Sequence, residues 1–207
     1  VPSLCQERRH PQAHDRKNAM ITRTAGLALL LFVSAQPVAA QDWQMAKGSS
    51  LGFSSSFQGE AFTGNFTRFK PDIRFDPKNL AQARFDVSID LGSVDSRNAE
   101  RDETLKTADF FDVGKATTAR YTASRFSTLG NGRYRADGQL TLRGISRPVA
   151  LVFSWKPGKS AVLSGEATVN RLDYRVGSGD WSDTGILPNA VKVKTVLVLV
   201  PKTPTKP

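Results

Sequence analysis

Cysteine and histidine are almost missing from this chain of 207 residues. The single cysteine, Cys5, and both histidines, His10 and His14, lie within the first fourteen residues. The rest of the chain therefore offers no thiol and no imidazole. This excludes disulfide bonds, thiol nucleophiles, thiolate or imidazole metal ligands and every histidine-based triad from that part. The acid–base groups that remain are carboxylates, lysine and tyrosine.

Long apolar runs are missing as well. Residues 25–33 form an apolar stretch far below the ~20 residues that a membrane-spanning helix needs. Arg23 precedes the stretch, and small residues at 37–40 follow it. A positive residue, a short apolar core and a small-residue exit together predict a secretory signal peptide at residues 20–40, cleaved after Ala40.

Residues 1–19 are polar and basic and lie ahead of a start-like Met20. We interpret them as a non-native extension of the gene start or as a long leader, disordered in either case. No cysteine follows the apolar stretch, which excludes a lipid-modified terminus. An exported chain without disulfides is typical of a periplasm, which is the location we expect.

Positive charge exceeds negative charge. Removing residues 1–40 takes five of the 29 lysines and arginines and two of the 19 carboxylates, which leaves +7 over 167 residues. This length suits one domain, which we place at residues 41–200. The basicity fits a soluble surface or an attraction to an anionic membrane face, and a transient membrane contact stays open. Nucleic acid is disfavoured because the cations are scattered.

Alternating polar and apolar residues dominate the expected domain, and the clearest cases are residues 83–91 and 134–143. A turn pair at Asn131-Gly132 precedes the second of these, and residues 143–148 are expected to turn the chain after it. The pattern predicts an all-β antiparallel meander of eight or nine strands, with a helical excursion at residues 98–106. Glycines suggest bulges or bends that curl the sheet, and residues 201–207 should be a disordered tail. The expected strands are 42–47, 51–57, 73–75, 83–91, 119–129, 134–143, 149–155, 161–170 and 191–200; Gly59 and Gly64 are the expected bends around a Phe-rich passage at 61–69.

Six motifs in order resemble those of the YceI-like family over roughly residues 43–200. One departure is Ala119-Arg120 ahead of Tyr121, where the family often has a proline. The resemblance implies an exported, lipocalin-like, eight-stranded antiparallel barrel whose elongated interior holds a polyisoprenoid or another long-chain lipid. It also implies a frequent homodimer, no known catalysis, and no cofactor besides the lipid. The motifs are Gly64 with Phe66-Thr67-Arg68-Phe69, Ile73-Arg74-Phe75-Asp76-Pro77, Ile89 to Asp95, Arg101-Asp102 to Asp109-Phe110-Phe111-Asp112, Gly138 to Gly144, and Asn170-Arg171-Leu172-Asp173-Tyr174.

Large residues on the expected inner faces stand beside alanine and glycine, which favours a lumen that is not completely filled. Gly138 in particular should leave room for a lipid. A second interpretation, that small residues only let strands bend, stays open. The expected lipid-binding residues are Phe53, Phe57, Phe66, Phe85, Phe110, Phe111, Tyr121, Leu140, Leu142, Phe153 and Trp155.

Two interpretations are open for the residues at the barrel ends. The phenylalanines at 62, 66, 69, 110 and 111 form either a lid or a sealing core, and Trp181 is expected at the opposite mouth. Residues 101–103 face either a head group or solvent. Asp180 and Asp183 lack further ordered ligands, so we expect no metal site.

Three functions remain in competition. The first is a periplasmic carrier or store for a long-chain lipid. The second is an enzyme acting on isoprenoid lipids, with Asp102 or Asp109 in its site, although no paired acid–base arrangement stands out. The third is an outer-membrane barrel, which is disfavoured by short strands and a charged insertion.

Overall fold

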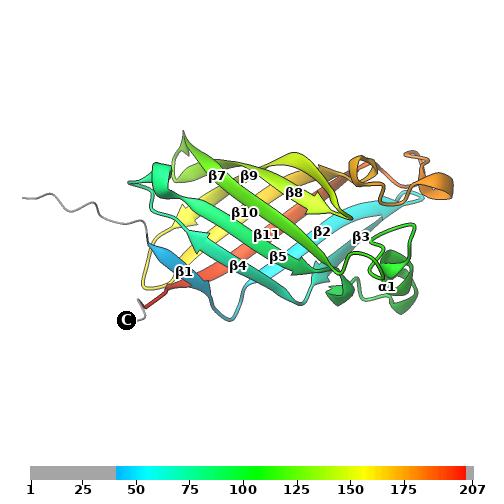
Figure 1. Ribbon diagram of the computed structural model, residues 1–207, viewed down its shortest axis with the longest axis horizontal. Coiled ribbons are helices and arrows are strands. Elements are labelled where there is room, and N and C mark those ends of the chain that lie inside the picture. The colour runs from blue at the N-terminus through cyan, green and yellow to red at the C-terminus, as the bar shows by residue number, and fades with distance from the viewer. Residues whose placement is uncertain (1–40, 204–207) are drawn as a thin grey trace, which may run out of the picture. The chain divides into compact units, whose positions relative to one another are not determined.

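The computed structural model describes residues 41–203, so the expected leader and signal peptide lie outside the described part. This part is built almost entirely from strands (Figure 1). The strands are β1 (Asp42–Met45), β2 (Ser50–Phe57), β3 (Glu60–Phe66), β4 (Phe69–Arg74), β5 (Arg84–Asp90), β6 (Val94–Asp95), β7 (Thr118–Gly130), β8 (Arg133–Leu142), β9 (Ile145–Lys156), β10 (Ala161–Asn170) and β11 (Ala190–Pro201); the α-helix is α1 (Ala99–Lys106), and short 3₁₀ turns occupy Leu80–Gln82, Leu91–Ser93, Arg171–Tyr174 and Gly179–Trp181.

Eight strands close into an antiparallel barrel in the order β1-β4-β5-β7-β8-β9-β10-β11, and β11 returns to β1 through the pair Pro201 and Trp43. This confirms the predicted barrel with its short helical insertion. Two strands share the same edge of β11. β1 pairs with residues 199–201 of β11, and β2 pairs with its residues 192–196. β3 and β6 extend the sheet beyond β2. Pro201, which we expected in the tail, ends β11 instead.

Two-residue hairpin turns set the register of the wall. Asn131-Gly132, Arg143-Gly144 and Gln58-Gly59 all have positive φ at both residues, which matches the twist of the strands they join. Gly59 is therefore a turn residue rather than a bend inside a strand. Gly64 pairs regularly with Phe53, and the irregularities lie in β7, at 123–125 and 128–130. The sequence-based placement of the bulges was wrong, because a glycine in a strand also serves close packing.

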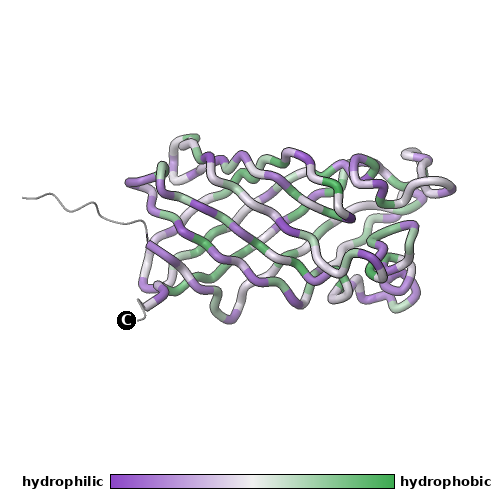
Figure 2. Tube along the Cα trace, in the orientation of Figure 1, coloured by the Kyte–Doolittle hydropathy of each residue, from purple (hydrophilic) through white to green (hydrophobic). Residues whose placement is uncertain are grey.

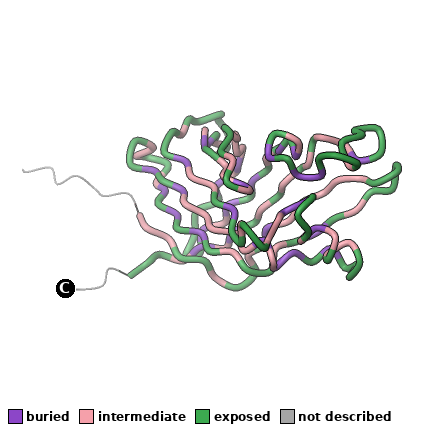
Figure 3. The backbone as a smooth tube through the Cα atoms, turned by 45° about the vertical axis from the view of Figure 1, so that its right-hand side comes forward, coloured by how far each residue is buried: buried purple, intermediate pink, exposed green. Residues whose placement is uncertain are grey.

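Hydrophobic and hydrophilic residues alternate along much of the barrel wall (Figure 2), and more buried residues alternate with more exposed ones there (Figure 3). Ion pairs cross the outer face, including Arg120 with Asp86 at 2.6 Å and Arg74 with Asp42 at 2.7 Å. Hydrogen bonds from these guanidinium groups lower the pKa of both carboxyl groups. The charged side of the wall therefore faces outward and the apolar side faces inward.

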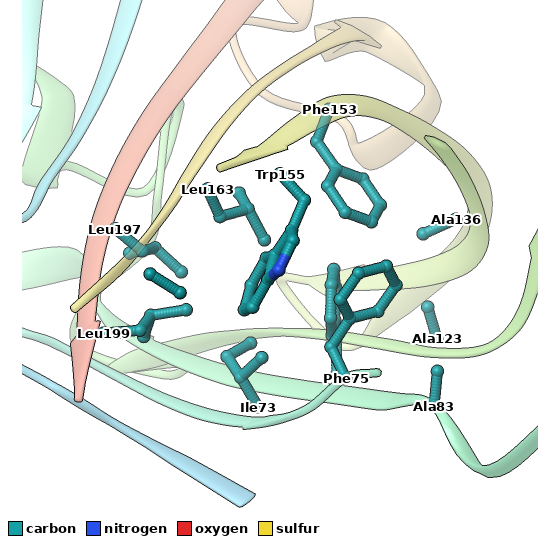
Figure 4. Packing of buried hydrophobic residues seen from close by; sticks show 12 residues of the cluster. Ile73, Phe75, Ala83, Ala123, Ala136, Phe153, Trp155, Leu163, Leu197 and Leu199 are labelled. Carbon is teal, nitrogen blue, oxygen red and sulfur yellow. The ribbon is translucent and has the colours of Figure 1, made fainter. Parts of the chain in front are cut away.

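The barrel end near β1 and the end of β11 is filled by an aromatic cluster, which we call the plug. Phe75 lies at its centre, with ring centroids 4.8 Å from Trp155 and 5.3 Å from Phe153. Alanines on the wall leave space for these rings, and leucines close the other side (Figure 4). Large rings therefore pack against small wall residues at this end. The buried residues of the plug are Ile73, Phe75, Ala83, Phe85, Ala123, Ala136, Phe153, Trp155, Ala161, Leu163, Leu197 and Leu199.

The other end is covered by α1, the segment after it and residues 171–189, which lie together at that end (Figure 1). Asn98 caps α1 by accepting a hydrogen bond from the Arg101 amide at 2.9 Å. Leu105 is the one buried residue of the helix. In the described part of the chain, no helix is both long and apolar enough to span a bilayer.

Candidate ligand cavity

An apolar cavity of about 220 Å³ lies between the plug and the loop-covered end, with residues of both regions in its lining. Its wall is apolar except for Ser55, Tyr121, Arg171 and Thr195. The Ser55 hydroxyl has no hydrogen-bond partner among the described residues. A cavity with so few polar groups can hold a hydrocarbon chain but offers little to a polar molecule.

Eight of the eleven expected binding residues line this cavity, and three do not. Phe153 and Trp155 belong to the plug, where they pack against Phe75. Phe57 is 38% exposed at the loop-covered end, with its ring centroid 6.1 Å from that of Trp181. Alternation shows which face of the wall a residue occupies, but not its height along the barrel. The eight in the lining are Phe53, Phe66, Phe85, Phe110, Phe111, Tyr121, Leu140 and Leu142.

Other lining residues come from the same alternating strands and were not singled out. Val87 and Ile89 follow Phe85 along β5 at every second position, and Leu91 continues the series into the 3₁₀ turn after β5. Leu51 and Ser55 flank Phe53 on β2. On β11, Val193 and Thr195 line the cavity from positions two residues apart. The signal was present in the period-two pattern, and a preference for aromatic candidates passed over the aliphatic ones.

The space above Gly138 is occupied by a protein side chain. The ring and hydroxyl of Tyr121 lie where a Cβ at Gly138 would be placed, and the hydroxyl donates to the carbonyls of Ala136 and Val149 at 3.2 and 3.3 Å. Burial raises the pKa of the Tyr121 hydroxyl. The expectation that Gly138 leaves room for a lipid was therefore wrong, because the missing side chain admits the tyrosine from the neighbouring strand.

Arg171 is a cavity residue that sequence reasoning did not assign to the site. It is 4% exposed, and its five N–H groups donate to the carbonyls of Val176, Gly177, Trp181, Leu187 and Pro188. No described carboxylate forms an ion pair with it. Desolvation lowers the pKa of its guanidinium. The residue therefore fastens the 176–188 loop over the cavity. The family motif around it was the available signal.

Arg143 fastens the neighbouring segment in the same way. From the turn between β8 and β9, its guanidinium donates to the carbonyls of Ala108 at 2.8 Å and Phe110 at 2.7 Å, and also to that of Arg175. The side chain is 16% exposed and lies 3.9 Å from a carboxylate oxygen of Asp112. One side chain thus joins the segment after α1 to the segment after β10.

Arg101 turns back onto its own segment instead of facing solvent or a head group. Its Nε donates to the Ser96 hydroxyl at 2.9 Å, and the guanidinium lies 4.6 Å from the Phe62 ring centroid. Asp102 accepts a hydrogen bond from the Ser96 amide at 2.8 Å. Arg101, Arg143 and Arg171, all from the quoted motifs, therefore hold the loops at one end of the barrel.

Trp181 lies at the same mouth as Phe110, not at the opposite one. Their ring centroids are 5.3 Å apart, and the Gly177 amide donates to the Asp109 carbonyl at 2.7 Å. The two loops meet because β7 and β11 both begin, and β10 ends, at this end of the barrel. The five phenylalanines expected as lid or seal all line the cavity near this mouth. Among the described residues, no group of three or more acidic, histidine or cysteine side chains is placed to hold a metal.

An antiparallel eight-stranded barrel closed around an apolar cavity belongs to the class of small β-barrels with room for one ligand. This chain is a member of the YceI-like family, whose YceI-like domain model matches residues 43–199. A UPF0312 protein of Vibrio vulnificus is 35% identical over 86% of this chain and 99% of its own length. Another UPF0312 protein, of Shewanella denitrificans, is 32% identical over 65% of this chain and 71% of its own.

Solved structures show the same fold. BcnA of Burkholderia cenocepacia aligns with a TM-score of 0.70 and 26% identity over 72% of this chain and 95% of its own. A structure described as a polyisoprenoid binding domain from Saccharophagus degradans aligns with a TM-score of 0.61 and 16% identity over 79% and 99%. The second likeness is one of fold alone.

Proposed function

We propose that this protein binds a long-chain lipid, a polyisoprenoid or a related amphiphile, in the barrel cavity and carries or stores it in the periplasm. The observation that carries the proposal is the cavity itself, in which 26 of 30 lining residues are apolar. Burial of a hydrocarbon chain against such a wall is favourable by about 25 cal/mol per Å². Family membership and the polyisoprenoid binding domain of like fold support the same ligand class.

The polar groups of the site favour a lipid with an uncharged head. Arg171 is the one cation in the lining, and all its N–H groups are already used by backbone carbonyls. The segments at the mouth (residues 58–60, 95–117, 143–144 and 171–189) hold ten carboxylates against seven cations. A phosphate or diphosphate would therefore meet no cation with a free N–H group in the cavity lining and net negative charge outside.

The structure gives less support to the two competing functions. Asp102 is engaged by the Ser96 amide, and the cavity lining contains no carboxylate that could act as an acid or base. Ion pairs on the outer face, such as Lys194 with Glu166, lie where a lipid-facing wall would need apolar side chains. These observations favour a lipid-binding protein over an enzyme. They also favour a barrel with an apolar interior over an outer-membrane barrel with an apolar outer face.

Solvent extraction of protein purified without detergent, followed by mass spectrometry, tests the ligand. We expect about one long-chain neutral lipid per chain. In competition, a polyprenol should displace it and the matching polyprenyl diphosphate should not. An empty extract would contradict the proposal.

Recovery from the periplasmic fraction with Gln41 as the first residue would test export, and light scattering would test the expected homodimer.

A cavity-filling variant separates binding from folding. Ala167→Phe places a ring into the cavity from β10, whereas Thr168→Phe places the same ring on the exposed face of the same strand. We expect the first to lower lipid content at least tenfold and the second to leave it unchanged. The free energy of unfolding of Ala167→Phe should change by less than about 1.5 kcal/mol, because the new side chain enters existing space. Equal lipid content in both would place the ligand elsewhere.

A further inference from the structure

The plug end of the barrel carries an excess of exposed positive charge. The connecting segments there, taken with the terminal residues of β7, β8 and β9, are residues 75–83, 130–133, 156–160 and 202–203, and Asp76 is their single carboxylate. The exposed cations of these segments are Lys78, Arg133, Lys156, Lys159 and Lys202.

These cations differ from most arginines of the barrel wall, although the wall lysines Lys70 and Lys192 also form no ion pair among the described residues. Wall arginines are largely neutralised, as in the pairs of Arg84 with Asp72 and Arg135 with Asp137 at 3.0 and 2.8 Å. None of the five plug-end cations forms an ion pair with a carboxylate in residues 41–203. Their charge therefore remains available to an outside partner.

The cations surround one end because the plug ties their segments together. The Trp155 amide, next to Lys156, donates to the carbonyl of Gly132 in the neighbouring hairpin turn at 3.0 Å. The Trp43 indole donates to the Phe75 carbonyl at 2.9 Å, and the Lys202 amide donates to the Asp42 carbonyl at 2.9 Å. The hairpin also presents Leu129, which is 48% exposed. An apolar tip among unpaired cations suits the headgroup region of a bilayer.

The opposite end carries charge of the other sign, since the mouth segments hold ten carboxylates and seven cations. A negatively charged surface therefore attracts the plug end and repels the mouth. We propose that the plug end is a docking surface for an anionic lipid bilayer and that the docked barrel holds its cavity mouth away from that bilayer. Docking requires no ligand in the cavity, so it stands or fails independently of the proposed lipid binding.

Vesicle co-sedimentation tests the docking with residues 41–207, which contain all the strand pairings of the closed barrel. At low salt, we expect binding to phosphatidylcholine vesicles with 30% phosphatidylglycerol and none to phosphatidylcholine alone. Lys156→Gln/Lys159→Gln should weaken the binding about tenfold or more, given typical contributions of lysines near a membrane. The matched control, Lys70→Gln/Lys192→Gln, removes the same charge from exposed wall positions and should bind within about twofold of the parent.

Orientation is read from single cysteines, which residues 41–207 otherwise lack. The fluorescence emission of a bimane label attached to Leu129→Cys should shift to shorter wavelength on anionic vesicles, because the label enters a less polar environment. The emission of the same label on Ile186→Cys at the mouth should not shift. Absence of binding to anionic vesicles, equal weakening in the wall control, or a shift at Ile186→Cys alone would overturn the proposal. Far-ultraviolet circular dichroism confirms that each variant is folded before it is compared.

Discussion

The two ends of this barrel use the same alternating strands and reach opposite results. At the plug end, Phe75 has five aromatic neighbours with ring centroids 4.8 to 6.0 Å away, and wall alanines make room for them. Toward the mouth, valines and leucines stand among phenylalanines that pack in pairs 5.6 to 6.5 Å apart, and a cavity remains. The difference shows that a barrel is solid or hollow according to side-chain volume at each level, not according to its inward pattern.

The largest expected effect comes from the plug. Phe75→Ala should lower the free energy of unfolding by about 3–5 kcal/mol, because the ring is fully buried among other rings and its removal leaves a void. Phe66→Ala, which removes a ring that already borders the cavity, should cost about half as much or less. Urea unfolding followed by tryptophan fluorescence measures both. Equal losses would mean that the two ends are packed alike.

The second-largest effect is expected for Arg171→Met, which should lower the free energy of unfolding by about 2–4 kcal/mol. The substitution leaves five loop carbonyls without their donors, and the penalty for unpaired buried polar groups exceeds the gain from removing a buried charge. Arg175→Met, at an exposed position four residues later, is the control and should change stability little. Faster hydrogen exchange confined to residues 176–188 would locate the effect, and unchanged exchange there would contradict the fastening role.

The two buried tyrosines should respond differently to removal of the hydroxyl. Tyr121→Phe loses the hydrogen bonds to two wall carbonyls and should cost about 1–2 kcal/mol. The Tyr174 hydroxyl has no hydrogen-bond partner among the described residues, so Tyr174→Phe should be neutral or slightly stabilising. Thermal unfolding by calorimetry compares the pair. A lower stability in Tyr174→Phe than in Tyr121→Phe would contradict this assignment.

The smallest expected effect is a loss of stability at alkaline pH, as Tyr174 ionises. Burial raises the pKa of the Tyr174 hydroxyl to about 12. A pKa raised in the folded state favours the protonated form, so the associated stability is present below pH ~10, the ordinary tyrosine range, and is lost as the pH rises toward 12. Absorbance of tyrosinate should show a late step that becomes smaller in Tyr174→Phe, while the buried Tyr121 still titrates late. Identical tyrosinate titrations of the parent and Tyr174→Phe would contradict the raised pKa of Tyr174.

Much of the fold could be predicted from local pattern. The period-two runs and the turn at residues 131–132 predicted the wall, because side-chain alternation and positive φ are properties of neighbouring residues. The turn expected over residues 143–148 is confined to 143–144, since β9 already begins at Ile145. Eight of the proposed cavity residues also followed from this pattern. The failures concern position along the barrel: Phe153 and Trp155 are in the plug, and the space at Gly138 is filled by Tyr121.

The sequence by itself determined the class of barrel, the family and the apolar character of the interior, since these depend on residue type and spacing. Only the tertiary structure decided that the plug is filled, that Trp181 and Phe110 share one mouth, and that Arg171 holds the loop above the cavity. Each of these depends on contacts between segments that are distant in the chain. Such contacts are set by strand order and register, which local pattern does not encode.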